Sequence, residues 1–305
     1  MSDRTSTTTR PIIFFGTEEA LAVTPLTKLL ESKYHITAIF TAPDNKAGRG
    51  QKLTAPKIKE IGLSHHIPVF QPEKSQEIRQ ILTTLTDEKL EITRPIGVLV
   101  GYGKIIPQSV LDWFEPLGIV NLHPSLLPKY RGPSPIETAI LNGDHATGIS
   151  LIRLTANMDA GAIYVQKKLA LGGKETKKEL YAKLSELGTE SLLAILPELP
   201  HFLATAQDET KASYCQKLDK SMSELKPREK TARELYNQIR AFLSFPKSKL
   251  NLCGINCVIT MADVAEHPQT ELDLKCQDGN YLIINRLIPE GRKEMTARDF
   301  LNGLH

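Results

Sequence analysis

The sequence predicts an α/β protein in two parts, an N-terminal domain with a mostly parallel sheet and a small C-terminal β-barrel. Over the first two-thirds, short apolar runs alternate with amphipathic stretches, which is typical of parallel strands covered by helices on both faces. The last third instead holds short apolar segments separated by turn residues. A chain of 305 residues, 41% hydrophobic and 24% charged, is long enough for two globular domains.

The N-terminal domain is predicted to span residues 1–203. Its apolar runs are predicted as strands at 11–17, 36–44, 67–72, 95–103 and 118–124. Residues 147–171 are expected to add a hairpin to the same sheet, and helices are expected from about residue 176 to 203.

The turn after the first strand decides which kind of α/β domain to expect. It reads FFGTEEA, and only Gly16 is present where a dinucleotide fingerprint needs Gly-x-Gly-x-x-Gly. The sequence also lacks a Walker-type phosphate loop and the Gly-x-Ser-x-Gly turn of α/β-hydrolases. We therefore expect a Rossmann-like sheet without the usual phosphate cradle, and a site at the carboxyl ends of its strands.

A polar, poorly patterned stretch at 204–216 is interpreted as a linker, and residues 217–305 as the second domain. Residues 232–242 have the pattern of one helix. Short strands are expected at 256–264, 271–279 and 281–289. Such strands favour a small barrel of the OB-like kind, and a sandwich remains the alternative.

The net charge of +3 is too small to indicate a nucleic-acid partner, but its distribution is uneven. Residues 211–250 carry a surplus of +6, whereas 251–305 carry −3. Residues 43–59, PDNKAGRGQKLTAPKIK, carry +4, and two glycines flank Arg49 within them. We expect this stretch to be irregular, either a solvated loop or a loop shaped to contact an anion.

The four cysteines all lie in the last third of the chain. Cys253 and Cys257 lack a nearby second Cys or His pair, so we expect reduced thiols and no metal. The first ten residues are polar and lack the apolar core of a secretory signal, and no apolar run approaches the ~20 residues that span a bilayer. We expect a cytoplasmic protein without a membrane partner.

Three polar residues are predicted to meet at the sheet edge. Asn121 and His123 are two residues apart on the strand GIVNLHP and therefore point to the same face. Asp159 follows a later strand in the loop LTANMDAG. Each residue alone is more often structural, but together they supply an amide donor, an imidazole and a carboxylate.

Four segments resemble the folate-dependent formyltransferases in chain order. They are FFGTEE, GYGKIIP, NLHPSLLPKYRG and MDAG. The resemblance implies that Asn121, His123 and Asp159 are catalytic, and that the donor is 10-formyltetrahydrofolate without a metal. It implies donor-binding roles for Ser125, Leu126, Leu127 and Pro128. The chain departs from the family pattern at Leu21, Gly101 and Ala162, which affects the expected shape of the pocket.

The implied reaction moves a formyl group to an amine. Attack on the formyl carbon places negative charge on its oxygen, to which Asn121 and His123 can donate hydrogen bonds. Asp159 can take the amine proton directly or through water while it orients His123. We expect direct transfer in a ternary complex, without a covalent intermediate.

The identity of the amine that accepts the formyl group is inferred from the basic stretch at residues 43–59. It resembles the pattern P-D-x-x-x-G-R-G-x-x-L of the family members that formylate initiator methionyl-tRNA for translation initiation. The resemblance places this loop at the tRNA acceptor end, with Arg49, Lys46 and Lys52 as contacts and the C-terminal domain as a second tRNA-binding part. The alternatives are formyl transfer to a sugar-nucleotide amine and a catalytically inactive RNA-binding protein. We expect a monomer.

Overall fold

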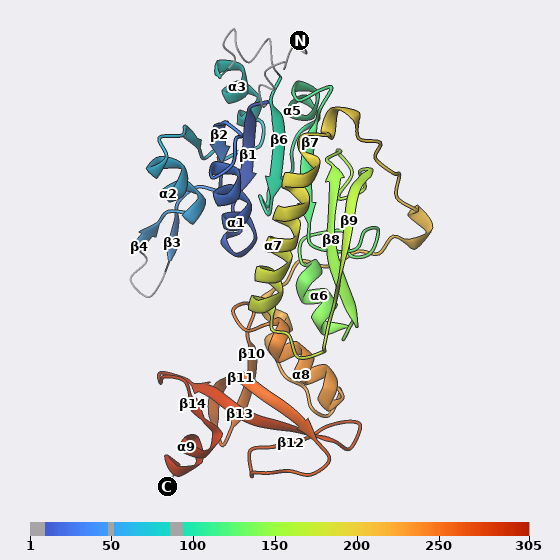
Figure 1. Cartoon of the computed structure of the whole chain (residues 1–305). Coiled ribbons are helices and arrows are strands. Elements are labelled where there is room, and N and C mark those ends of the chain that lie inside the picture. The colour runs from blue at the N-terminus through green and yellow to red at the C-terminus, as the bar shows by residue number, and fades with distance from the viewer. Residues whose placement is uncertain (1–9, 48–51, 86–93, 305) are drawn as a thin grey trace, which may run out of the picture. The chain divides into compact units, whose positions relative to one another are not determined.

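The computed structural model describes residues 10–47, 52–85 and 94–304 (Figure 1). The chain forms two compact units. The first consists of Met1–Arg131, Gly148–Lys168 and Tyr181–Tyr214. The second consists of Gly132–Thr147, Leu169–Leu180 and Cys215–His305.

A seven-stranded sheet has the order β5-β2-β1-β6-β7-β8-β9. The neighbouring strands from β5 to β7 pair in parallel, and β8 pairs antiparallel with β7. The predicted Rossmann-like, mostly parallel sheet is therefore confirmed. Its strands are β1 (Ile12–Gly16), β2 (Ile36–Phe40), β5 (Val69–Phe70), β6 (Ile96–Val100), β7 (Ile119–His123), β8 (Ala146–Arg153) and β9 (Ile163–Ala170).

Helices follow these strands as the alternating pattern predicted. Their bounds are α1 (Glu19–Leu30), α2 (Lys57–Ser64), α3 (Glu77–Thr84), α5 (Gln108–Trp113), α6 (Pro135–Leu141) and α7 (Lys177–Ile195). Figure 1 shows α1 and α7 in front of the strands, and the Ser185 hydroxyl of α7 donates to the carbonyl of Leu21 in α1. Gly188 of α7 lies against Leu122 of β7, where any Cβ would collide with the leucine side chain. A small residue at 188 thus lets α7 approach the strand that carries Asn121 and His123.

An apolar core joins β1, β2, α3 and α5. It includes stacked Phe15 and Phe40 rings, 4.8 Å apart, with Phe114 packed edge-on against Phe15. Burial of three aromatic side chains in one layer contributes both apolar area and ring-ring contacts to the stability of the sheet.

The expectation of an irregular basic stretch is wrong at its two flanks. Strands β3 (Asn45–Ala47) and β4 (Lys52–Thr54) pair antiparallel, with Lys46 opposite Leu53. The glycines fall between the two paired segments in the sequence, so they do not interrupt the ladder on either side. Arg49 lies outside the described residues.

The C-terminal sheet has the order β10-β11-β13-β12, with β14 also paired to β13. Its pairs are antiparallel, and among the described residues no pairing joins the first strand to the last, so the sheet is a half-barrel. The predicted helix and small β-domain are confirmed, whereas β10 was not expected. The elements are α8 (Ala232–Ala241), β10 (Ser248–Leu252), β11 (Ile255–Ala265), β12 (Leu274–Lys275), β13 (Tyr281–Pro289), β14 (Met295–Thr296) and α9 (Ala297–Asn302).

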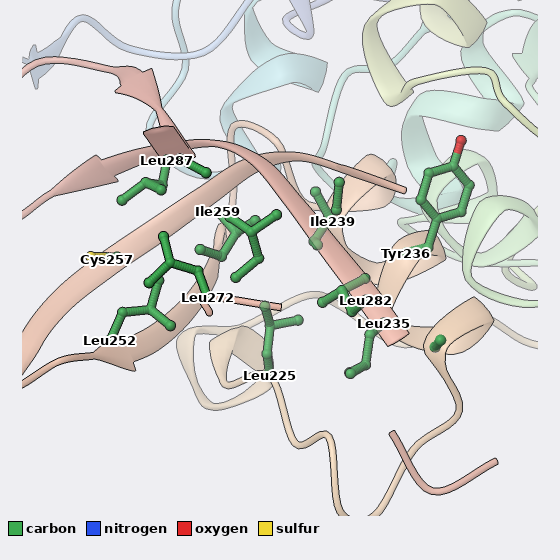
Figure 2. Close-up of a cluster of buried hydrophobic side chains, with 14 of the residues drawn as sticks. Leu225, Leu235, Tyr236, Ile239, Leu252, Cys257, Ile259, Leu272, Leu282 and Leu287 are labelled. Carbon is green, nitrogen blue, oxygen red and sulfur yellow. The ribbon is translucent and has the colours of Figure 1, made fainter. Parts of the chain in front are cut away.

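Helix α8 supplies one side of the half-barrel core. Its start is fixed by a capping box, in which the Thr231 hydroxyl accepts from the Glu234 amide and the Glu234 carboxylate accepts from the Thr231 amide. Leu235 and Ile239 then project from one face of α8 into the apolar cluster shown in Figure 2, together with Leu282 of β13. This spacing of four residues explains why the sequence pattern identified the helix.

The expectations about membrane spans and cysteines can be compared with the described residues. No helix among them is long and apolar enough to cross a membrane. All four cysteines are free thiols, of which only Cys253 is exposed.

Candidate active site

Strand β7 places two of the predicted residues inside the fold. Asn121 and His123 are 6% and 5% exposed, and they lie on one face at the carboxyl end of the strand. Asn121 pairs with Leu99 of β6, and His123 pairs with Ser150 of β8. Ladders on both sides therefore fix the backbone from which the two side chains project.

Asp159 reaches the same place from the turn between β8 and β9. Its φ of 48° is in the left-handed region, which Asp tolerates better than most residues. At Gly161 a Cβ would collide with the carbonyl oxygen of Arg153, so this tight turn requires glycine there. The turn thus brings back to β7 a carboxylate that lies 38 residues from Asn121 in the chain.

The three predicted catalytic side chains meet. The amide of Asn121 donates to Oδ1 of Asp159 at 3.3 Å. Nδ1 of His123 lies 3.6 Å from Oδ2 of the same carboxylate. A separation of 3.6 Å is an ion-pair distance rather than a hydrogen bond, so a substrate atom can compete for either group.

The backbone carbonyl of Tyr130 defines the state of the imidazole. Nε2 of His123 is 2.9 Å from that oxygen. Because a carbonyl only accepts, Nε2 carries the hydrogen, and Nδ1 is the nitrogen that faces Asp159. The tautomer with its hydrogen on Nε2 therefore leaves Nδ1 directed toward the carboxylate of Asp159, 3.6 Å from Oδ2.

The predicted folate-contacting residues form a loop that is held by hydrogen bonds within itself and to β8 and β9. The Ser125 hydroxyl donates to the Lys129 carbonyl at 2.6 Å, and the Ser150 hydroxyl donates to the Ser125 carbonyl at 2.7 Å. The Leu127 amide donates to Ser150, and Gln166 donates to the Leu127 carbonyl. Fixed in this way, the loop has a defined shape beside His123.

The four residues of this loop differ in what they can offer a ligand. Ser125 and Leu127 are 1% and 3% exposed, whereas Leu126 and Pro128 are partly exposed. Ser125 and Leu127 are therefore buried and hold the loop in shape. Leu126 and Pro128 keep accessible surface that a ligand can contact.

Strands β3 and β4 form a hairpin, here called the basic hairpin, and an ion pair fixes its base. The Lys59 ammonium donates to both oxygens of Asp44, at 2.9 and 2.8 Å, and Gln71 donates to one of them at 2.7 Å. These hydrogen bonds, that from Lys59 first, hold the pKa of Asp44 below its usual range. Lys57 is also paired, with Glu60 at 2.8 Å. The side chains of Lys46 and Lys52 lie outside what the structure describes, as does Arg49.

The sequence did not indicate roles for two further residues near the site, Arg131 and Gln207. Arg131 belongs to the motif KYRG, and its guanidinium is 1% exposed. Gln207 lies in the stretch interpreted as a linker, and its side chain donates to the carbonyls of Asp159 and Gly161. The motif KYRG contains Arg131 but gave no role for it. Gln207 could not be singled out, because the polar residues of the 204–216 stretch follow no pattern.

Comparison with known families gives two matches that together cover most of the chain. The family model described as Formyl transferase matches residues 10–196, and the one described as Formyl transferase, C-terminal domain, matches residues 217–305. The chain belongs to the formyl transferase family. The boundaries of the two matched regions fall on either side of the stretch from 197 to 216.

Relatives of this formyl transferase are similar over nearly their whole length. The methionyl-tRNA formyltransferase of Methylococcus capsulatus is 35% identical over 95% of this chain and 96% of its own. That of Lactiplantibacillus plantarum is 34% identical over 96% and 95%. Among solved structures, the N-formyltransferase of Helicobacter canadensis, in complex with folinic acid and dTDP-3-aminofucose, has a TM-score of 0.67. It is 19% identical over 90% of this chain and 98% of its own, so it supports the fold alone.

Proposed function

We propose that the protein transfers the formyl group of 10-formyltetrahydrofolate to the α-amino group of methionine on initiator methionyl-tRNA. The observation that carries the proposal is the near full-length identity of about one-third to relatives named methionyl-tRNA formyltransferase. The proposal includes a cytoplasmic location, because translation initiation takes place there.

The amide of Asn121 is the proposed donor to the formyl oxygen. Its bond to Asp159 is long, at 3.3 Å, and uses only one of its two N–H groups. The residue is 6% exposed, and an amide aimed at a developing oxyanion stabilises it more strongly where water is excluded. A protonated Nδ1 of His123 is the proposed second donor, from the side that faces Asp159.

Asp159 is the proposed proton acceptor. An α-amino group titrates near ~7.7–8.0, so a useful fraction is neutral at physiological pH and must lose a proton only as the new C–N bond forms. The carboxylate of Asp159 takes that proton directly or through water. The leaving nitrogen of the folate gains a proton when its bond to the formyl carbon breaks, and the His123–Asp159 pair is the proposed source.

The loop from Ser125 to Pro128 is the proposed contact for the folate donor. The chemistry of the site fits such a donor, since an amide, an imidazole and a carboxylate are what an uncharged acyl group and an amine need. Leu126 and Pro128 offer the accessible apolar surface, and Ser125 and Leu127 hold them in place. The donor is a substrate in this proposal, and no metal takes part.

The tRNA contacts are proposed at two places. Arg49, Lys46 and Lys52 on or between β3 and β4 are assigned to the acceptor end, and the C-terminal half-barrel to another part of the tRNA. In this assignment residues 1–203 are catalytic, 204–216 connect the domains and 217–305 contact tRNA, with the protein acting as a monomer. A surplus of cations in residues 211–250 supports it, because each neutralised phosphate adds affinity.

The deciding experiment offers two alternative acceptor amines to the purified full chain in the presence of 10-formyltetrahydrofolate. Charged initiator methionyl-tRNA should be converted to formylmethionyl-tRNA, whereas a dTDP-amino sugar should remain unmodified. Uncharged tRNA serves as the control for non-specific consumption of the donor. Formylation of the sugar nucleotide in preference to the charged tRNA would overturn the proposal.

A further inference from the structure

Two residues beside the catalytic cluster have a left-handed backbone without being glycine. They are Tyr130, with φ of 62°, and Asp159, with φ of 48°. Such conformations persist where surrounding contacts determine them. The first residue accepts the hydrogen bond from His123 and the second provides the catalytic carboxylate. What holds these two backbones therefore sets the geometry of the site.

The segment 205–214 contacts the turn that carries Asp159. Thr205 and Ile163 exchange two backbone hydrogen bonds, of 2.9 and 2.8 Å, which align the segment with the start of β9. Two residues further on, Nε2 of Gln207 donates to the carbonyl of Asp159 at 2.7 Å and to that of Gly161 at 2.8 Å. One side-chain amide thus spans the turn and fixes two of its carbonyls.

The other end of Gln207 is held by a buried cation. Its Oε1 accepts from Nε of Arg131 at 3.1 Å and from Nη2 at 2.8 Å. Arg131 also donates to both oxygens of Glu209, at 2.8 and 2.7 Å. Every polar atom of the Gln207 side chain is engaged, with two bonds accepted by the oxygen and two donated by the nitrogen. These contacts also define which end of the amide is oxygen.

The same segment holds the backbone that bonds His123. Ser213 accepts from the Tyr130 amide through its hydroxyl, at 3.0 Å, and from the Arg131 amide through its carbonyl, at 2.8 Å. Its own amide donates to the carbonyl of Pro128 at 3.1 Å. The segment therefore contacts the supports of both His123 and Asp159.

We propose that Gln207 is a positioning residue for formyl transfer, because it couples the Asp159 turn to buried Arg131 and so sets the carboxylate against Asn121 and His123. The inference rests on the proposed function. It assigns Gln207, together with Ser213, to the support of the active site, although both lie between the two matched domains. Glutamine is required, since leucine makes neither pair of bonds and glutamate makes only one.

The test is Gln207→Glu, which keeps the hydrogen bonds to Arg131 and removes those to the Asp159 turn. A carboxylate keeps and strengthens the contact with Arg131, but it turns an acceptor toward two carbonyl oxygens that only accept. The Asp159 turn should lose its support while the fold keeps its buried ion pair. We expect kcat to fall roughly ten- to hundredfold, as for a displacement of about 1 Å at a catalytic group, with KM for both substrates much less affected.

Glu209→Gln is the matched control. It removes the charge that accepts from Nη1 and Nη2 of Arg131 but leaves both hydrogen bonds from Gln207 to the turn in place, so it should lower the melting temperature while kcat per folded molecule stays at the wild-type value. Folded sites in each variant are counted by binding of a folate analogue, and thermal unfolding is measured in parallel. Gln207→Leu should combine the kcat loss with a loss of stability.

The outcomes are distinct. A Gln207→Glu protein with wild-type kcat, or one that loses no more kcat than Glu209→Gln, would overturn the positioning role. A wild-type protein that does not formylate methionyl-tRNA would instead overturn the proposed function, before any variant is compared.

Discussion

The proposed catalytic cluster, Asn121, His123 and Asp159, and the hairpin of β3 and β4 belong to the same unit but are built differently. Asn121 and His123 are almost fully buried, and each is bonded to a neighbouring group. On the hairpin, Leu53 is 61% exposed, and the ion pair of Asp44 with Lys59 lies at its base. Chemistry on a small group needs fixed donors in a low dielectric, whereas contact with a large polyanion needs exposed charge. The difference shows which residues are expected to affect turnover and which to affect tRNA affinity.

The largest expected effect is in the cluster. Asp159→Asn and His123→Ala should each lower kcat by roughly 10²- to 10⁴-fold, the range for removal of an acid-base or oxyanion-stabilising group. Asn tolerates the left-handed backbone at 159, so the turn should survive the first change. Single-turnover formylation and circular dichroism measure the two properties. Near-normal turnover in either folded variant would break the assignment of catalysis to this cluster.

A smaller loss is expected when the turn rather than the chemistry is changed. Gly161→Ala places a Cβ against the carbonyl of Arg153, so the backbone must move. We expect a loss of about 3 kcal/mol in the free energy of unfolding, together with lower kcat because Asp159 shifts. Gly172→Ala is a suitable control, since φ is not positive at either glycine and a Cβ at 172 would meet only Oε1 of Glu175, at an ordinary contact distance of 3.4 Å. Urea unfolding compares the two, and equal losses would remove the role of the close approach at Gly161.

Substitutions in the basic hairpin should affect the affinity for tRNA. Arg49→Ala should lower kcat/KM for charged initiator tRNA roughly tenfold, the size of one charge-assisted hydrogen bond, and Arg49→Lys should lower it less. The slope of log K against log salt should become shallower by roughly 0.7 to 0.9 for each lost phosphate contact. Donor binding should stay unchanged.

Lys57→Ala is the control for the hairpin, because Lys57 is half-exposed and already paired with Glu60. Its effect on kcat/KM should be minor at both low and high salt. Equal, minor effects of the Arg49 and Lys57 changes would mean that the stretch is a solvated surface with no preferred contact.

The smallest effect concerns the base of the hairpin. The pKa of Asp44 is lowered by hydrogen bonds from Lys59 and Gln71, so its stabilising contribution is present above the pKa of an unfolded aspartate. It is lost as pH falls through the lower folded value. Asp44→Asn should therefore be slightly less stable than the wild type at pH 7, and the difference should vanish once the pH lies below the lowered pKa of Asp44 in the folded protein. A thermal-unfolding difference that persists at low pH would argue against this ion pair.

The sequence predicted what depends on local periodicity. Alternating apolar runs identified the parallel strands, and the spacing of two residues placed Asn121 and His123 on one face. Strand β10 was missed because SKLNL is short and half polar, and β3 with β4 because glycines next to Arg49 suggested irregular structure. Gln207 was beyond prediction, since its partners Asp159 and Arg131 lie 48 and 76 residues away. Such contacts arise from the folded chain and leave no local pattern.

The position of segment 205–214 in the chain has a consequence for biosynthesis. A polypeptide leaves the ribosome N-terminus first, so Asn121, His123 and Asp159 are made long before Gln207 and Ser213. A nascent chain that ends before Thr205 contains the three chemical groups without the contacts that orient them. Formyl transfer should therefore begin only late in translation, once residue 213 has emerged and closed onto the sheet.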